Sequence, residues 1–218
     1  MRPYEQREYW ERDDLARRRP PDHPAVAAYV ASRIKAIRRV VPIERSSKVL
    51  DVGCGSGAFT YHLDRICDVT GVDTSQRMLD MNPVPRVHLM DAEALDLPDR
   101  SFDVVLAHAL LHHLDDPSAA VREMARVSRR WVVLMEPNRN NPLMFAFAAI
   151  VRAERATLRF TPGYLRRLAE ASGVRTVDVW ASGLLVPNKT PTSIAPLLAR
   201  LDIRQPLGFT CTLVGGRE

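Results

Sequence analysis

The sequence predicts an α/β fold in which a parallel β-sheet carries helices on both faces. Two observations lead to this fold class. Short apolar runs alternate with helix-like segments from about residue 48 to residue 135, as expected for strands joined by helical crossovers. A glycine-rich turn also follows the first apolar run directly, in the stretch VLDVGCGSGAFT at Val49–Thr60.

The first forty residues are predicted to be helical. A charged segment spans Tyr4–Arg19, the sequence PPDHP interrupts it, and a second helix runs from about Ala25 to Val40. Pro42 and the polar ERSS segment then end this helix.

The central part of the chain supplies the parallel strands. They are expected at Lys48–Val52, Val69–Val72, Val87–Met90, Phe102–Ala107 and Trp131–Met135. Helical spacing separates most of them, at Ala58–Ile66, Ser75–Met81 and Pro117–Val127. The helix at Ser75–Met81 is short because Pro83 and Pro85 follow it.

The pattern changes after the fifth strand. Pro142–Arg159 is expected to form an extra helix, and TPGYLRRLAEASG a compact helix with Gly173 at its C-terminal cap. Two final strands follow at Val174–Trp180 and Phe209–Val214. Between them lies the insertion Ala181–Gly208, which has four prolines and a short helix near Ile194–Leu201. Insertions of this length are usually functional loops or lids.

The charge balance alone does not predict a nucleic-acid partner. The net charge of +5 and the pI near 9.4 are compatible with one. However, only three of the 31 basic residues are lysines, and the arginines are spread along the chain, mostly beside acidic neighbours. The one local cluster is ARRRPP at Arg17–Arg19, for which a solvated helix end is the simpler interpretation.

Cysteine usage and the apolar runs indicate a soluble cytoplasmic protein. Cys54, Cys67 and Cys211 are too few and too scattered for a disulfide framework or a zinc site. The N-terminus has no apolar core of a signal peptide. The most apolar run, Pro142–Val151, is about half of the ~20 residues that a membrane-spanning helix needs.

The glycine-rich turn is the predicted ligand site. In an open parallel sheet, ligands bind beyond the carboxyl ends of the strands, where the strand order reverses. Gly53 and Gly55 allow a tight turn and a close approach of ligand to backbone. Asp73 follows at the end of the second strand and can accept hydrogen bonds from two ribose hydroxyls. A dinucleotide site has the same glycines and the same acidic residue, so these features alone do not identify the ligand.

Two details distinguish the ligands. Gly53, Gly55 and Gly57 give the spacing G-x-G-x-G instead of the dinucleotide spacing G-x-G-x-x-G. Asp51 also places a carboxylate at the turn, where a pyrophosphate would meet repulsion of roughly 1 kcal/mol or more. A ligand with a ribose, an ammonium and no phosphate fits, and S-adenosylmethionine is such a ligand. The alternative is that Asp51 caps a helix end or bonds loop amides.

Four sequence blocks carry a family resemblance. VLDVGCGSGAFT, VTGVDTS, HLMDAEALDLPDRSFDVVLAHALLHHLDDP and WVVLMEPN occur in order between about Val49 and Asn138. Together they resemble the class I S-adenosylmethionine-dependent methyltransferases, in particular the methyltransferase type 11 group. The resemblance implies a Rossmann-like sheet of seven strands in the order 3-2-1-4-5-7-6, with the last strand antiparallel. It also implies a single methyltransferase domain over 1–218, with an N-terminal helical cap at 1–42, a cofactor-binding core at 43–140 and substrate-side helices, insertion and final strands at 141–218.

The resemblance also implies which residues hold the cofactor. Gly53, Gly55 and the neighbouring backbone would hold the methionyl part, with Asp51 facing its ammonium, while Asp73 would hold the ribose. Asp91 would accept from the adenine amino group, the Ala92 backbone would meet the ring, and the main chain at His108 would line the methionine pocket. The complete expected set is Asp51, Gly53, Gly55, Gly57, Asp73, Thr74, Asp91, Ala92 and His108.

Candidate catalytic residues follow the fourth and fifth strands. Methyl transfer requires alignment of the nucleophile with the methyl group, and a base only if the acceptor loses a proton early. His112, His113 and Glu136 are the candidates, with Glu136 preferred as a substrate-facing acid. The histidines could instead be packing and pocket residues, and Glu136 could bond loop amides. His108 and His112 are spaced i, i+4 but lack a third ligand, so no metal is predicted.

The acceptor side is expected to be roomy and partly apolar. NPLMFAFAAIV and the insertion Ala181–Gly208 occupy the regions where relatives build the acceptor pocket. Tyr4, Tyr9 and Trp10 are either a lid over the cofactor or ordinary packing residues. We therefore expect a small aromatic, sugar-linked or lipid-like acceptor, methylated on O or N, and no nucleic acid.

Three alternatives stay open at this point. The pI favours an RNA or tRNA methyltransferase, although the chain has no N-P-P-Y-type motif for base methylation and no appended RNA-binding module. A nicotinamide dehydrogenase is contradicted by the glycine spacing and by Asp51. The third alternative is a non-catalytic relative that binds the cofactor for regulation or assembly.

Overall fold

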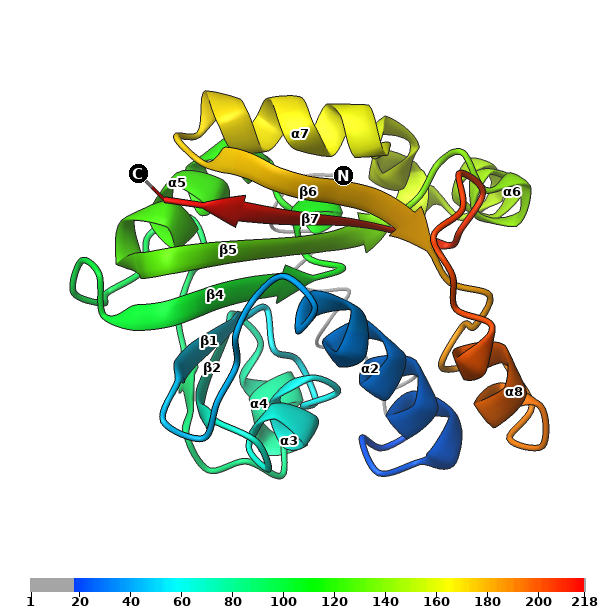
Figure 1. The fold of residues 1–218 in the computed structure, drawn as a ribbon, viewed down its shortest axis with the longest axis horizontal. Helices are drawn as coiled ribbons and strands as arrows, with labels where there is room; N and C mark the ends of the chain where they lie inside the picture. Colours follow the sequence, from blue (N-terminus) through cyan, green and yellow to red (C-terminus); the bar gives the residue numbers. More distant parts are fainter. Residues whose placement is uncertain (1–17, 218) are drawn as a thin grey trace.

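A seven-stranded sheet forms the centre of the molecule, with helices on both faces (Figure 1). A computed structural model describes residues 18–217. The strands run in the order β3-β2-β1-β4-β5-β7-β6, and β7 is antiparallel to both of its neighbours. This confirms the predicted strand order. The strands are β1 (Lys48–Val52), β2 (Asp68–Asp73), β3 (Val87–Leu89), β4 (Phe102–His108), β5 (Ser128–Pro137), β6 (Arg175–Ser182) and β7 (Thr210–Gly216).

The strand order reverses between β1 and β4, which pair in parallel. The chain leaves β1 toward β2 on one side and leaves β4 toward β5 on the other. The loops that follow β1 and β4 therefore diverge, and a crevice opens between them at the carboxyl ends of the strands. Both strands are buried on both faces, as expected for the centre of a parallel sheet.

Helices α5 (Pro117–Val127) and α7 (Pro162–Ala171) cover one face of the sheet. Both begin with an N-cap side chain followed by proline: Asp116 accepts from two backbone amides, and Thr161 accepts from one. Gly173 follows α7 with φ +82°, and the next amide, at Val174, donates to Ala169 O at 2.9 Å. The predicted glycine stop of this helix is confirmed.

Helices α2 (Pro24–Ile37) and α3 (Thr60–Leu63) pack against the other face, and α8 (Ala195–Arg200) packs against α2. Figure 1 shows α2 beside α8, so the N-terminal helix covers part of the Ala181–Gly208 insertion. A buried ion pair between Arg33 of α2 and Asp202 just after α8 joins the two. The Arg33 guanidinium also lies 4.6 Å from the ring centroid of Tyr29.

The predicted helix over Pro142–Arg159 is wrong as a single element. Helix α6 (Pro142–Ile150) ends at Val151, whose φ of −86° and ψ of 107° are not helical. The chain then turns back, and the 3-10 segment η3 (Arg152–Arg159) packs against α6. The expected helix at Ala58–Ile66 is also shorter, since α3 covers only Thr60–Leu63.

Of the two remaining short helical segments, α4 (Gln76–Asp80) matches its predicted position, whereas the 3-10 segment η2 (Leu111–His113) was not predicted. α4 joins β2 to β3, and η2 follows β4. Among the described residues, no helix combines the length and apolar composition needed to cross a membrane. The predicted segment Tyr4–Arg19 lies mostly outside the described residues, as do Tyr4, Tyr9 and Trp10.

Candidate functional site

The glycine turn after β1 has the conformation that its sequence predicts. Gly53, Gly55 and Gly57 have φ values of +71°, +50° and +93°, which favour glycine over any other residue. The amides of Gly53 and Cys54 both donate to Val72 O, at 2.8 and 3.0 Å. These bonds fix the turn against the end of β2.

Asn82 braces the same turn from the other side. Its Nδ2 donates to Gly55 O at 3.2 Å, and a Cβ built on Gly57 would lie 2.6 Å from its Oδ1. Gly57 does not line the cavity, so its role is to admit Asn82 and not to contact the cofactor. Sequence reasoning missed Asn82, although the short helix before Pro83 is the signal that brings this residue to the turn.

A cavity of about 600 Å³ opens where the glycine turn meets the carboxyl ends of the strands. Most of the predicted site residues share it. Gly53, Gly55, Asp73, Thr74, Asp91, His108, His112 and His113 all line its wall. Asp51, Gly57, Ala92 and Glu136 are not among the lining residues.

Asp51 lies beneath the turn and not at its surface. Its side chain is buried, and its Oδ2 accepts from Thr60 Oγ1 at 2.7 Å. Burial raises the pKa of Asp51 from 3.8 to about 7, against the lowering effect of the Thr60 hydrogen bond. The expectation that its carboxylate faces the cofactor ammonium is corrected here: Asp51 ties the turn to the start of α3, as the alternative interpretation proposed.

Asp73 has the position that a ribose-binding acid needs. Its Oδ2 accepts from Gly55 N and its Oδ1 from Ser75 N, both at 2.9 Å. These bonds fix the orientation of the carboxylate, which lines the cavity. Asp73 thus both shapes the glycine turn and faces the cavity.

The loop after β3 supplies the next wall. Asp91 is exposed on it, and its Oδ1 accepts from Glu93 N at 2.9 Å. The side chain of Ala92 packs into the core, while Glu93 lines the cavity. The expected contact of the Ala92 backbone with the adenine ring stays a prediction. The local bridge between Asp91 and Ala94 turns the Ala92 side chain inward.

The donor set suits S-adenosylmethionine better than a dinucleotide. Carboxylates outnumber guanidinium groups in the cavity wall, so a pyrophosphate would meet net repulsion there. The carboxylates are those of Asp73, Asp91, Glu93, Asp115 and Glu154, and the guanidinium groups are those of Arg18 and Arg19. A cationic ligand with ribose hydroxyls meets acceptors there, and Gly55 leaves its side of the cavity free of a side chain.

His108 is the last residue of β4, and its uncharged imidazole lines the cavity. Its Nε2 is hydrogen-bonded to Tyr29 Oη at 2.7 Å, and its ring lies 4.7 Å from that of Phe59. Burial and the positive charge of Arg33 lower the pKa of His108 to about 3. Tyr29 comes from α2, so the N-terminal helix helps to build the site.

The chain leaves β4 through a strained residue. Ala109 has φ +51°, and its amide donates to Met135 O at 2.8 Å. A left-handed conformation is uncommon outside glycine and costs roughly 1–2 kcal/mol. This turn directs the following residues, Leu111–His113, toward the cavity as η2.

Glu136 holds η2 in place from beneath. Its side chain is buried, its Oε1 accepts from the amides of Leu110 and Leu111 at 3.0 and 2.7 Å, and its Oε2 lies 2.6 Å from His112 Nδ1. The expectation of a substrate-facing acid is corrected, because every polar atom of this carboxylate is bonded to η2. Glu136 acts on the site through the His112 ring and through the backbone amides of Leu110 and Leu111.

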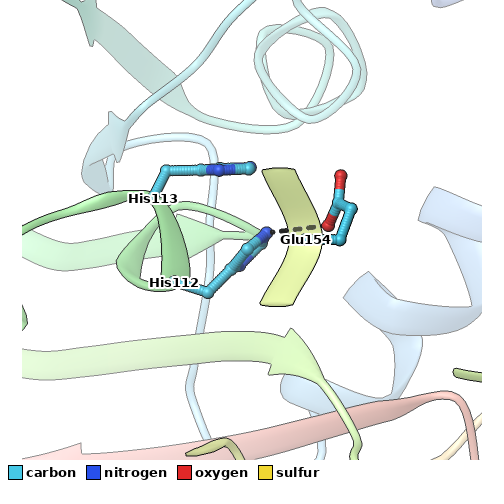
Figure 2. Close-up of side chains that lie close together, drawn as sticks. All are labelled: His112, His113 and Glu154. Carbon is cyan, nitrogen blue, oxygen red and sulfur yellow. Dashed lines mark ion pairs between the residues drawn. The ribbon is translucent and has the colours of Figure 1, made fainter. Parts of the chain in front are cut away.

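His112 and His113 of η2 meet Glu154 of η3 (Figure 2). His112 Nε2 lies 3.4 Å from Glu154 Oε2, and the two imidazole centroids are 3.8 Å apart. Burial lowers the pKa of His112, but Glu136 and Glu154 outweigh it and raise the value to about 9. Burial and the adjacent His112 hold the pKa of His113 well below its usual range.

Glu154 is a site residue that the sequence did not indicate. The predicted continuous helix would have carried it away from the sheet. The turn at Val151 instead folds η3 back over η2.

The insertion closes another side of the cavity. Pro187 and Asn188 line it, and Arg19 Nη1 donates to Pro187 O and Thr190 O at 2.8 and 2.7 Å. Arg19 belongs to the only basic cluster that the sequence showed. In the structure it binds the insertion, as a structural residue would.

Comparison with known proteins agrees with this arrangement. A family model described as a methyltransferase domain matches residues 50–134. A phosphatidylethanolamine N-methyltransferase of Cereibacter sphaeroides is 38% identical over 96 residues, which cover 39% of this chain and 47% of that protein. A demethylmenaquinone methyltransferase of Staphylococcus haemolyticus is 29% identical over 129 residues, 54% of each chain. The chain thus spans about half the length of the curated relatives it matches.

The fold comparison extends over more of the chain. A crystal structure from Thermotoga maritima, described as an S-adenosylmethionine-dependent methyltransferase and possible histamine N-methyltransferase, superposes with a TM-score of 0.68. The match covers 89% of this chain and 91% of that one at 20% identity, which shows a shared fold. Residues 50–134 thus match a methyltransferase domain, and the strand order and the superposition show that the chain has the fold of S-adenosylmethionine-dependent methyltransferases.

Proposed function

We propose that this protein transfers a methyl group from S-adenosylmethionine to an oxygen or nitrogen of a small organic acceptor. One observation carries the proposal: a single cavity joins the glycine turn and Asp73 at one end to the polar group on η2 and η3 at the other. Donor and acceptor can therefore meet without a movement of the sheet. The protein would act in the cytoplasm, as its three free buried cysteines suggest.

The donor end would hold the cofactor with backbone and carboxylates. Gly53 and Gly55 would face the methionyl part, Asp73 and Thr74 the ribose, and Asp91 the adenine amino group. When bound, S-adenosylmethionine supplies a methyl group already activated by the adjacent sulfonium charge. The protein then has to hold donor and acceptor in line and exclude water.

The acceptor end would be organised by η2. His112 and His113 line the cavity. With a raised pKa, His112 is protonated near neutral pH and can donate a hydrogen bond to the acceptor, whereas the neutral imidazole of His113 can accept a hydrogen bond or a proton from an acceptor hydroxyl or amine. Glu136 would be a positioning residue, since its carboxylate holds the η2 backbone and the His112 ring.

A lipid-like acceptor is the class that the surroundings favour. Helix α6 lies beyond the carboxyl end of β5 (Figure 1) and packs on η3, which lines the cavity through Glu154. This helix exposes large apolar side chains at Leu143, Phe145, Phe147 and Ile150. The names of the two curated relatives, a phosphatidylethanolamine and a demethylmenaquinone methyltransferase, agree with an apolar acceptor.

Methyl transfer to fractionated extracts tests the proposal. Purified protein is incubated with S-adenosylmethionine labelled in the methyl group and with a lipid extract, an aqueous small-molecule extract or total RNA. We expect label in the lipid extract, and at least tenfold less label when Asp73→Ala protein is used at a limiting S-adenosylmethionine concentration. Label in RNA alone would contradict a lipid-like acceptor and indicate an RNA methyltransferase. If the protein binds S-adenosylmethionine tightly but transfers no label, it is a non-catalytic relative.

A further inference from the structure

A compact set of metal-ligating side chains lies in the wall of the cavity. His112, His113 and Glu154 each offer one ligand atom, and these atoms lie within 4.8 Å of one another (Figure 2). They come from two separate elements, η2 and η3, that the fold brings together. The sequence predicted no metal because the third ligand is distant along the chain.

The separation of the ligand atoms suits a transition metal. Two ligands at about 2.1 Å from a tetrahedral ion stand about 3.4 Å apart. His112 Nε2 and Glu154 Oε2 are 3.4 Å apart. Binding would draw His113 and Glu154 slightly inward, and both side chains are only partly buried.

Glu136 supplies the support that such sites require. A metal-binding histidine usually donates its other ring N–H to a carboxylate, which fixes the tautomer and the ring orientation. Glu136 Oε2 lies 2.6 Å from His112 Nδ1, and Glu136 Oε1 is itself held by two backbone amides. Nε2 of His112 is thereby directed toward Glu154.

We propose that His112, His113 and Glu154 bind a divalent first-row transition metal. Two imidazoles and one carboxylate favour ions of the zinc type over magnesium or calcium, which prefer all-oxygen ligands. Three protein ligands leave a coordination position open, as in catalytic sites, and all three residues line the cavity.

The role of the metal rests on the proposed function, whereas its binding does not. If methyl transfer occurs in this cavity, the open position would hold an oxygen or nitrogen of the acceptor and orient its lone pair toward the methyl group. The metal would then take the place of the direct hydrogen bond from the imidazoles.

Direct metal binding tests the inference. Protein stripped with a chelator is titrated with Zn²⁺ by calorimetry and with Co²⁺ by visible absorption. We expect one ion per chain and Co²⁺ bands of a nitrogen- and oxygen-ligated ion. Glu154→Gln and His113→Gln should each weaken Zn²⁺ binding by tenfold or more, while His88→Gln, which changes an exposed histidine on β3, should not.

The outcomes separate this inference from the proposed function. Equal Zn²⁺ affinity of Glu154→Gln and His88→Gln protein would overturn the metal site, as would the absence of stoichiometric binding. Methyl transfer that persists in chelator-treated protein would refute the role of the metal while the proposed function stands. Tight Zn²⁺ binding without any methyl transfer would refute the proposed methyltransferase function and support the metal site.

Discussion

Two aspartates at the ends of neighbouring strands show how environment sets the role of a residue. Asp51 and Asp73 follow equivalent apolar runs, but only Asp73 reaches the cavity. Asp51 is buried against Thr60, while Asp73 accepts from the amides of Gly55 and Ser75 and lines the cavity. One therefore stabilises the turn, and the other is available to the ligand.

Loss of either cavity aspartate should weaken cofactor binding. Asp73→Ala and, separately, Asp91→Ala are expected to reduce the affinity for S-adenosylmethionine tenfold or more, since each buried bond to a ligand is worth about 1–3 kcal/mol. Asp73→Ala should have the larger effect, because the amide of Gly55 also loses its acceptor. Calorimetry measures both, with His88→Gln as the control, and an unchanged affinity would contradict the assignment.

Asp51 should make the stability of the protein depend on pH. Its pKa is 3.8 when unperturbed and about 7 in the fold, so between these values the native state holds a proton that the unfolded chain releases. Stability therefore falls as pH rises from about 4 to 7, by about 4 kcal/mol in total. Asp51→Asn retains an acceptor for Thr60 and should lose this dependence.

Thermal unfolding of both proteins across that pH range measures the effect. The Tm of Asp51→Asn is expected to exceed that of the natural sequence increasingly from pH 4 to pH 7. A constant difference between the two would show that Asp51 does not carry the proton.

At the scale of elements, the site depends on segments that stop early. Helix α4 ends at Asp80, which allows the Asn82 side chain to bond Gly55. Helix α6 ends before Val151, which allows η3 to pack against η2. Continuous helices in either place would remove Asn82 from the turn or Glu154 from the cavity. Helix length is thus part of the site.

Two glycines with similar φ allow the packing at the turn to be measured. A Cβ on Gly57 (φ +93°) would meet Asn82, whereas one on Gly173 (φ +82°) would meet nothing within 4 Å. Gly173→Ala should cost only the left-handed conformation, about 1–2 kcal/mol. Gly57→Ala should cost more and also lower cofactor affinity. Urea unfolding measures the stability of both variants, and calorimetry measures their cofactor affinity. Equal losses of stability would show that the Asn82 side chain moves aside without cost.

The ion pair between Arg33 and Asp202 should hold the insertion to α2. Both side chains are buried, so Asp202→Ala leaves an uncompensated guanidinium and is expected to cost about 3–5 kcal/mol. The double variant Arg33→Met, Asp202→Ala should recover part of that loss, because no buried charge is left unpaired. Urea unfolding measures all three proteins, and a double variant no more stable than Asp202→Ala would contradict this account.

For the whole molecule, part of the arginine content is structural. Ion pairs join Arg33 to Asp202, Arg86 to Asp64, Arg122 to Asp116, Arg126 to Asp99, Arg129 to Asp103 and Arg204 to Asp178. Charges that are paired within the chain contribute little to a field that could attract nucleic acid. The basic pI therefore does not require a nucleic-acid partner.

RNA binding should accordingly be weak. Filter binding of total transfer RNA at about 50 and 200 mM salt is expected to show no specific complex at either concentration. A complex whose affinity falls by about 10³-fold or more between these concentrations would indicate several phosphate contacts and revive the RNA methyltransferase alternative.

The patterns that predicted the fold are local ones. Alternating apolar runs located the strands, and Pro117, Pro162 and Gly173 marked helix ends, because each acts on its own segment of backbone. Patterns could not locate the end of α6, since Val151 is compatible with a helix by composition. Its extended conformation is set by the packing of η3 on the rest of the fold.

The sequence by itself determined the sheet and the edge of the sheet at which the proposed cofactor residues meet. The glycine turn, Asp73 and Asp91 follow consecutive strands, and a parallel sheet brings the carboxyl ends of its strands to one edge. Only the tertiary structure decided the acceptor side. Glu154 is separated from His112 by two helices and a strand, and whether Asp51 and Glu136 face the cavity or the core depends on packing from several elements at once. Burial and long-range contact leave no periodic trace in a sequence, so the donor end was predictable and the acceptor end was not.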